Sequence, residues 1–215
     1  MHAGNSSAIR RAALAGAVGA GLTAVSGIFV QSVVQPSTTV SDKMWSYPWS
    51  SAALIPISIV YAALHVLVVI GLIGLRASRP AGSSHWGQRG LSLAVAGTLL
   101  LLVGELASLA ARHAHTDDTG ALVVGIVFAG AIILNAVGFL VAGQATARAG
   151  VWPGWRRWTP LATGVWTCAL LALNATKALP TGVAIYGLFL LAIFWAMLTA
   201  PSPIPAGHAT APQPA

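Results

Sequence analysis

Six stretches of about 20 residues, nearly free of charged side chains, constrain the fold of this chain more than any other feature. They cover residues 12–34, 52–75, 91–111, 121–144, 161–179 and 181–200. A helix needs about 20 apolar residues to cross a hydrocarbon core of about 30 Å, so each stretch is long enough to span a bilayer. The sequence therefore predicts an all-α fold, a polytopic transmembrane bundle of about six helices.

The amino-acid composition excludes an ordinary soluble fold. Hydrophobic residues make up 56% of the 215 residues, whereas Asp, Glu, Lys and Arg together make up 7%, against roughly 25% in a soluble domain. The net charge of +7 would suit a nucleic-acid-binding protein if the basic residues clustered on one solvated face. They lie instead between the apolar stretches, so the lipid bilayer is the expected partner and nucleic acid is not.

The basic residues also predict the orientation, because short loops rich in Lys and Arg stay in the cytoplasm. One set of alternating loops holds eight arginines: Arg10, Arg11, Arg76, Arg79, Arg89, Arg148, Arg156 and Arg157. The other set holds three basic residues and three aspartates: Lys43, Arg112, Lys177, Asp42, Asp117 and Asp118. Both termini are therefore expected in the cytoplasm, with residues 1–11 as the N-terminus and residues 201–215, rich in Pro and Ala, as a disordered tail.

Small residues recur along the first stretch at a spacing that brings helices close together. Gly16 with Ala20, and Gly19 with Thr23, are small-xxx-small pairs, which membrane helices use for close backbone contact. Packing against other helices of the same chain is one interpretation. A homo-oligomer held together through the same residues is the other.

Glu105 is the only acidic residue inside a predicted span, and ionisable groups within a membrane are functional candidates by default. Counted along the helix, it lies near the outer end of the third stretch, at a depth similar to that of Asn174 and Lys177 in the fifth. An ion pair with Lys177, or a hydrogen bond from Asn174, would make Glu105 structural. The alternative is a site that binds a proton or a cation.

His65 in the second stretch and Asn135 in the fourth are expected at comparable depth. A hydrogen bond between them would satisfy both side chains, and a proton relay is the alternative role for His65. Tyr61, one helical turn before His65, lies between His65 and Glu105 in depth, so it is placed to join them in a polar track. No cofactor is indicated, because haem held by two histidines would need a second His within a span.

The loop between the third and fourth stretches contains two imidazoles and two carboxylates. Such side chains are ligands for divalent metals such as zinc, although a short solvated loop often contains them without binding a metal. The candidate ligands are His113, His115, Asp117 and Asp118.

The loop before the fifth stretch alternates indole and guanidinium groups. We expect it to lie along the lipid headgroups, where Trp prefers the interface and Arg meets phosphates. A docking site for a cytoplasmic or membrane partner protein is the alternative. The residues are Trp152, Trp155, Arg156, Arg157 and Trp158.

Several short motifs resemble those of small, uncharacterised six-helix membrane proteins of high-GC Gram-positive bacteria, over residues 41–198. They are Tyr47-Pro48-Trp49, His65, Gly104-Glu105, Trp155-Arg156-Arg157 and Thr159-Pro160-Leu161. The resemblance implies a multi-pass protein of a bacterial plasma membrane and brings no activity with it.

Two functions follow from these features as hypotheses. The first is a non-catalytic membrane component that senses a signal or binds a partner. The alternative is a small permease or ion-coupled transporter that uses a buried Glu, Tyr and His track. An enzyme ranks third, because the sequence contains no HExxH pattern and no Ser, His and Asp spacing typical of a catalytic triad.

Overall fold

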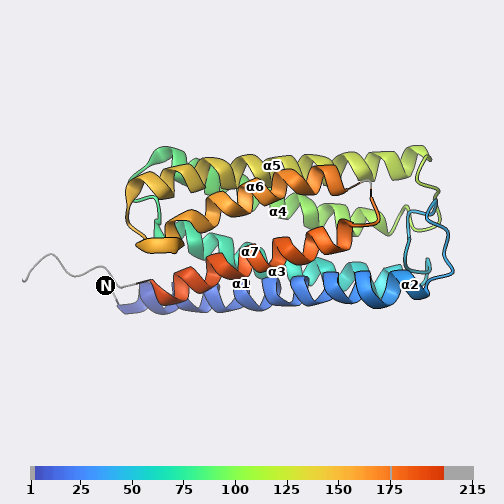
Figure 1. Cartoon of the computed structure of the whole chain (residues 1–215), viewed down its shortest axis with the longest axis horizontal. Coiled ribbons are helices and arrows are strands. Elements are labelled where there is room, and N and C mark those ends of the chain that lie inside the picture. Colours follow the sequence, from blue (N-terminus) through green and yellow to red (C-terminus); the bar gives the residue numbers. More distant parts are fainter. Residues whose placement is uncertain (1–2, 175, 201–215) are drawn as a thin grey trace, which may run out of the picture.

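The computed structural model describes residues 3–174 and 176–200, which are mostly helical and contain no β-strand. The predicted tail, residues 201–215, lies outside this part. Six long helices lie side by side in a bundle (Figure 1). They are α1 (Ala3–Phe29), α3 (Leu54–Ser78), α4 (His85–Ser108), α5 (Thr119–Ala149), α6 (Thr159–Leu173) and α7 (Leu179–Thr199). The predicted all-α class is confirmed.

Five of these helices are long and apolar enough to cross a membrane, which supports the prediction of a membrane-embedded protein. They are α1, α3, α4, α5 and α7. The helix that begins with α1 continues through a π-helical turn, η1 (Val30–Val34), into α2 (Gln35–Ser37). Helix α6 has 15 residues and therefore measures about 22 Å, less than the thickness of a hydrocarbon core.

The fifth helix ends earlier than predicted, so Asn174 and Lys177 do not lie inside it. The backbone N–H and the hydroxyl of Thr176 both bond to the carbonyl of Leu173, at 2.9 Å each, and close a turn there. Helix α7 then begins at Leu179 with Pro180 in its first turn, where a missing N–H costs no helical hydrogen bond. Residues 174–178 form the connection.

The first helix begins earlier than predicted, at Ala3 rather than residue 12. Arg10 and Arg11 consequently lie on the helix and not on an extended cytoplasmic segment. Alanines at positions 3 and 8 favour a helix, and the single Gly4 near its start does not stop it.

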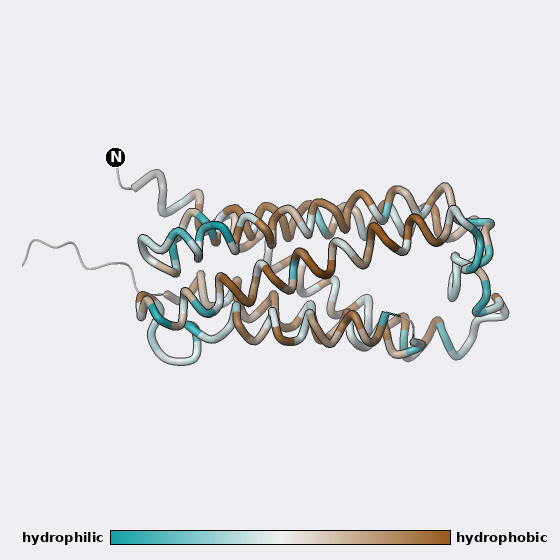
Figure 2. Tube along the Cα trace, turned by 90° about the horizontal axis from the view of Figure 1, so that it is seen from above, coloured by the Kyte–Doolittle hydropathy of each residue, from teal (hydrophilic) through white to brown (hydrophobic). Residues whose placement is uncertain are grey.

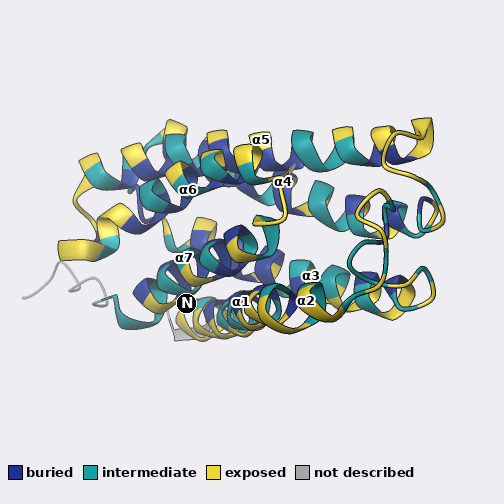
Figure 3. Ribbon diagram, turned by 45° about the vertical axis from the view of Figure 1, so that its right-hand side comes forward, coloured by how far each residue is buried: buried dark blue, intermediate teal, exposed yellow. Residues whose placement is uncertain are grey.

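The helices form two layers of three (Figures 1 and 3). In one layer α1 lies between α3 and α7, and in the other α5 lies between α4 and α6. Contacts of α3 with α4, and of α6 with α7, join the layers into a closed ring. The core contains the fully buried side chains of Leu72, Leu75, Phe139, Ile193 and Phe194.

The small residues of α1 pack within the chain. A Cβ atom on Gly19 would lie 2.8 Å from Cβ of Leu67 on α3, and one on Gly27 would lie 2.5 Å from the carbonyl oxygen of Pro180 on α7. Both distances are too short for a side chain, so these glycines let α1 approach its two neighbours. This packing supports the interpretation that the small residues of α1 contact other helices of the same chain.

The two ends of the bundle differ in charge. The α3–α4 and α5–α6 connections lie at the end where α1 begins and α7 ends (Figure 1), and we call it the arginine-rich end. The connections 38–53, 109–118 and 174–178 lie at the opposite end, which we call the aspartate end because it holds Asp42, Asp117 and Asp118. Hydrophilic residues gather toward both ends, and apolar residues run along the helices between them (Figure 2).

Candidate functional site

Three polar side chains lie on one face of α3. Ser58, Tyr61 and His65 are separated by three and four residues, the spacing that stacks side chains on one side of a helix. Counted from Leu54, where α3 begins at the aspartate end, they lie about 6, 10 and 16 Å into the bundle. We call these three residues the polar stripe of α3.

Two atoms of the polar stripe are buried without a hydrogen-bond partner among the described residues. They are Oγ of Ser58 and Nδ1 of His65. The backbone of Tyr61, one turn before His65, is close to the imidazole, but their geometry does not complete a hydrogen bond. An unsatisfied buried polar group costs about 1–3 kcal/mol. Such atoms therefore indicate a place where water, an ion or another polar group is accommodated.

Glu105 faces this stripe from α4. It lies three residues before the end of the helix at Ser108, about 5 Å from that end, and within electrostatic reach of the Tyr61 hydroxyl. Its side chain is partly buried. No hydrogen bond or ion pair joins its carboxyl group to any residue in 3–174 or 176–200.

Tyr61 lies where three helices meet. Its hydroxyl interacts with Ser26 of α1 as well as with Glu105 of α4, and α3 packs against both of these helices. The structure therefore brings Tyr61 into electrostatic reach of Glu105, while His65 lies one helical turn deeper than Tyr61 on the same face of α3. It adds Ser26 and Ser58, which sequence analysis missed, although Ser58 stands at helical spacing from Tyr61. We call these five residues the polar site.

The partners expected for Glu105 lie elsewhere. The ammonium Nζ of Lys177 is 3.0 Å from Oδ2 of Asp42, and both side chains are exposed. The hydrogen bond from Lys177 holds the pKa of Asp42 below its ordinary value, and the same contact raises the pKa of Lys177. Asn174 caps the C-terminus of α6, a helix that packs against α5 and α7 rather than against α4. The predicted Glu105 pairings are therefore wrong.

The sequence suggested a hydrogen bond between Asn135 and His65, but the structure does not contain it. Oδ1 of Asn135 lies 3.2 Å from the Thr98 hydroxyl and 3.4 Å from the Tyr186 hydroxyl, and its Nδ2 donates to the carbonyl of Ala131 at 3.2 Å. Asn135 faces α4 because Gly97 leaves room for it: a Cβ atom there would lie 2.6 Å from Nδ2. This buried cluster joins α4, α5 and α7, so its role is structural.

Two connections at the aspartate end pair with each other. The amide of Trp45 donates to the carbonyl of Ala114 at 3.0 Å, and the amide of Thr116 donates to the carbonyl of Lys43 at 2.8 Å. The Trp45 ring lies 6.4 Å from that of Phe128 on α5, and Phe128 packs against Gly104. These contacts tie the two connections to α5 and, through Phe128, to α4 at Gly104.

The four candidate metal ligands in residues 113–118 do not form a site. Among the described residues there is no group of three or more His, Cys, Asp or Glu side chains able to hold a metal ion. The carboxylate of Asp118 instead accepts a hydrogen bond from the amide of His115 at 2.8 Å. The loop uses that carboxylate for its own turn, and His113, His115 and Asp117 do not converge on it.

The Trp and Arg segment at the arginine-rich end is largely exposed, but Trp152 does not lie where the sequence predicted. Trp152 is only 4% exposed and packs in the hydrophobic core, so it does not face headgroups or a partner. The guanidinium of Arg156 lies 5.5 Å from the Trp155 ring centre, and that of Arg157 lies 5.2 Å from the Trp158 ring centre. The 3-10 helix η2 (Gly154–Trp158) presents these pairs.

No family model, curated protein or solved structure matches the chain. The function must therefore be inferred from the chemistry of the polar site. That site combines one carboxyl group without an ionic partner among the described residues, a phenol, an imidazole and two hydroxyls in the half of the bundle nearest the aspartate end. Such groups bind protons or small cations in proteins.

Proposed function

We propose that this protein is a non-enzymatic component of a membrane that senses protons or a small cation at the polar site. The observation that carries the proposal is Glu105, an acid within a predicted span that has no ionic partner among the described residues. The unpartnered atoms of Ser58 and His65, about 10 Å apart along α3, offer two separate positions on the same face where a water can bind. Because an intramembrane charge is costly, binding at Glu105 changes the energy of the bundle and so provides a signal.

The apolar continuation of α3 favours sensing over transport. Beyond His65 the same face of the helix carries Val68, Leu72 and Leu75, all at most 3% exposed. A pathway across the bundle would need polar groups or water along this face, whereas the polar stripe stops about 16 Å from the start of the helix. The alternative is a proton- or ion-coupled permease. The polar stripe of α3 supports it, but transport would require the apolar part of the bundle beyond His65 to open to water.

We further propose that the arginine-rich end faces the cytoplasm of a bacterium and that the six helices cross its plasma membrane, with α6 as a short crossing. The excess of arginine at that end supports this orientation. The two Trp–Arg pairs of η2, of which Arg156 also donates a hydrogen bond to the Thr199 hydroxyl at 3.2 Å, then lie at the inner headgroups, where we place the contact with a partner protein. Substituting Arg156 and Arg157 together should release that partner and leave the helical content unchanged.

The experiment that tests the proposal is infrared difference spectroscopy of the protein in liposomes. The carboxyl band of Glu105 should change when the pH or the cation on one side is changed, and the change should be missing in Glu105→Gln. Asp117→Asn, which removes an exposed loop acid, is the matched control and should keep the band. Identical difference spectra for wild type and Glu105→Gln would refute a role of Glu105 in sensing.

The same liposomes separate sensing from transport. A sensor should show the Glu105 band without a net proton flux, as followed with a dye enclosed in the vesicles. A flux that is present in wild type and missing in Glu105→Gln would establish the permease instead.

A further inference from the structure

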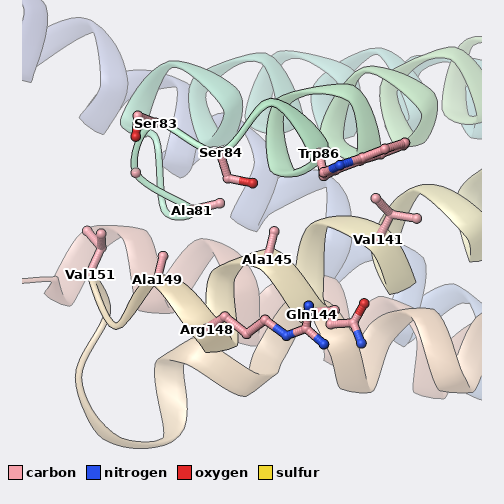
Figure 4. A pocket seen from close by; sticks show the side chains of 11 residues that line it. Ala81, Ser83, Ser84, Trp86, Val141, Gln144, Ala145, Arg148, Ala149 and Val151 are labelled. Carbon is pink, nitrogen blue, oxygen red and sulfur yellow. The ribbon is translucent and has the colours of Figure 1, made fainter.

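A groove of about 660 Å³ opens at the arginine-rich end, between the α3–α4 connection and the last turns of α5. One wall carries Ser83, Ser84 and Trp86, and the other carries Gln144 and Arg148 (Figure 4). Small side chains such as Ala81 and Ala145 leave the space between the walls open. We infer that this groove binds the phosphate headgroup of an anionic phospholipid.

The charges around the groove call for an external anion. Arg148 makes no ion pair or hydrogen bond with any described residue, and its guanidinium lies at one wall of the groove beside Gln144 (Figure 4). All four acidic residues of the chain, Asp42, Glu105, Asp117 and Asp118, lie at or near the aspartate end. A guanidinium forms its strongest hydrogen bonds with carboxylate or phosphate, and the described residues at this end of the bundle supply no carboxylate side chain.

The other polar groups suit a phosphate ester. The Ser83 hydroxyl and the Gln144 amide can donate hydrogen bonds to phosphate oxygens, while the Trp86 ring is 67% exposed. Arg89 stands over that ring, with its guanidinium carbon 5.6 Å from the ring centre, and places a second positive charge beside the groove. Trp and Arg together are typical of the headgroup region of a membrane.

The surface next to the groove distinguishes a lipid from a free anion. Val137 and Ile133 on α5 are exposed. Val137 lies seven residues before Gln144, and Ile133 lies four residues before Val137, so all three share one face of the helix. An acyl chain can therefore lie along α5 toward the bundle centre while its headgroup occupies the groove. Inorganic phosphate would make no use of this apolar face.

The test is native mass spectrometry of the full chain in mild detergent, with phosphatidylglycerol, phosphatidylcholine or inorganic phosphate added. Wild type should retain one phosphatidylglycerol at concentrations where phosphatidylcholine is lost, and Arg148→Gln should weaken this retention about tenfold, the effect of removing a charge-assisted hydrogen bond. Arg76→Gln removes an exposed arginine at the same end but outside the groove, and should change retention less than about twofold.

A second measurement guards against a change in folding. Phosphatidylglycerol should raise the thermal unfolding midpoint of wild type and of Arg76→Gln, and leave that of Arg148→Gln unchanged. Equal retention of both lipids, equal losses in the two variants, or complete competition by inorganic phosphate would each overturn the lipid assignment.

Discussion

Nζ of Lys177 lies 3.0 Å from Oδ2 of Asp42, and this ion pair joins the α6–α7 connection to the connection that follows α2. The only basic residue that the sequence offered to Glu105 is therefore engaged at the surface of the bundle. Glu105 is left within electrostatic reach of the Tyr61 hydroxyl, and the same face of α3 carries the unpartnered atoms of Ser58 and His65. With Lys177 engaged there, no described residue forms an ion pair with Glu105.

The ion pair itself has a predictable pH dependence. The pKa of Asp42 is lowered from 3.8 and that of Lys177 is raised from 10.5. Its contribution to stability is therefore present between these two values, is lost as pH falls through the folded pKa of Asp42, and is lost as pH rises through the folded pKa of Lys177. Because both side chains are exposed, the contribution is small and is screened by salt.

We expect wild type and Asp42→Asn to differ slightly in thermal unfolding midpoint at neutral pH and low salt. The difference should vanish at pH values below the folded pKa of Asp42 and at high salt. A difference that persists under both conditions would show that Asp42 acts through something other than this ion pair.

The Asn135 cluster should contribute measurably to stability. Asn135→Leu leaves the buried Tyr186 hydroxyl without its acceptor, so we expect a loss of about 1–2 kcal/mol in the free energy of unfolding. In a double-mutant cycle, Asn135→Leu and Tyr186→Phe should couple by about 0.5–1 kcal/mol. The pair Asn135→Leu and His65→Leu should show no coupling, and a clear coupling between them would restore the contact that the sequence suggested.

The glycines of α1 offer a matched pair of substitutions. Gly27→Ala places a Cβ atom 2.5 Å from the carbonyl oxygen of Pro180, so α1 and α7 must separate, at a cost of about 1–3 kcal/mol. At Gly21, on the same helix, a Cβ atom would have no neighbouring atom within 4 Å, so Gly21→Ala should be neutral or slightly stabilising. Thermal unfolding in detergent checks both, and equal effects would contradict the α1–α7 packing.

The proposed orientation can be tested with single cysteines. In a Cys168→Ser background, which removes the chain's one cysteine, Ser41→Cys reports on the aspartate end and Ser83→Cys on the arginine-rich end; both positions are exposed. A maleimide that cannot cross membranes should label position 41 in intact cells, and position 83 only after the membrane is opened. The opposite pattern would reverse the orientation of the bundle.

The sequence by itself determined that the chain is helical and where most helices lie. Long apolar runs specify helices in a membrane because every backbone N–H and C=O must be satisfied within the segment, and this requirement is local. For the same reason the errors occur at ends: α6 stops at Leu173 where Thr176 closes a turn, and α1 starts at Ala3. Glu105, Tyr61 and His65 were also recognisable, since polar groups stand out in an apolar run.

Only the tertiary structure decided which polar groups meet. Counting residues along each predicted helix gives Asn135 and His65 a comparable depth. Depth alone, however, does not determine the rotation of a helix about its axis or the order of the helices around the ring. Gly97 leaves room for Asn135 beside Thr98 and Tyr186, while the packing of α3 on α4 brings Tyr61 into electrostatic reach of Glu105. Those choices depend on close contacts between helices far apart in the chain, which no local pattern in the sequence encodes.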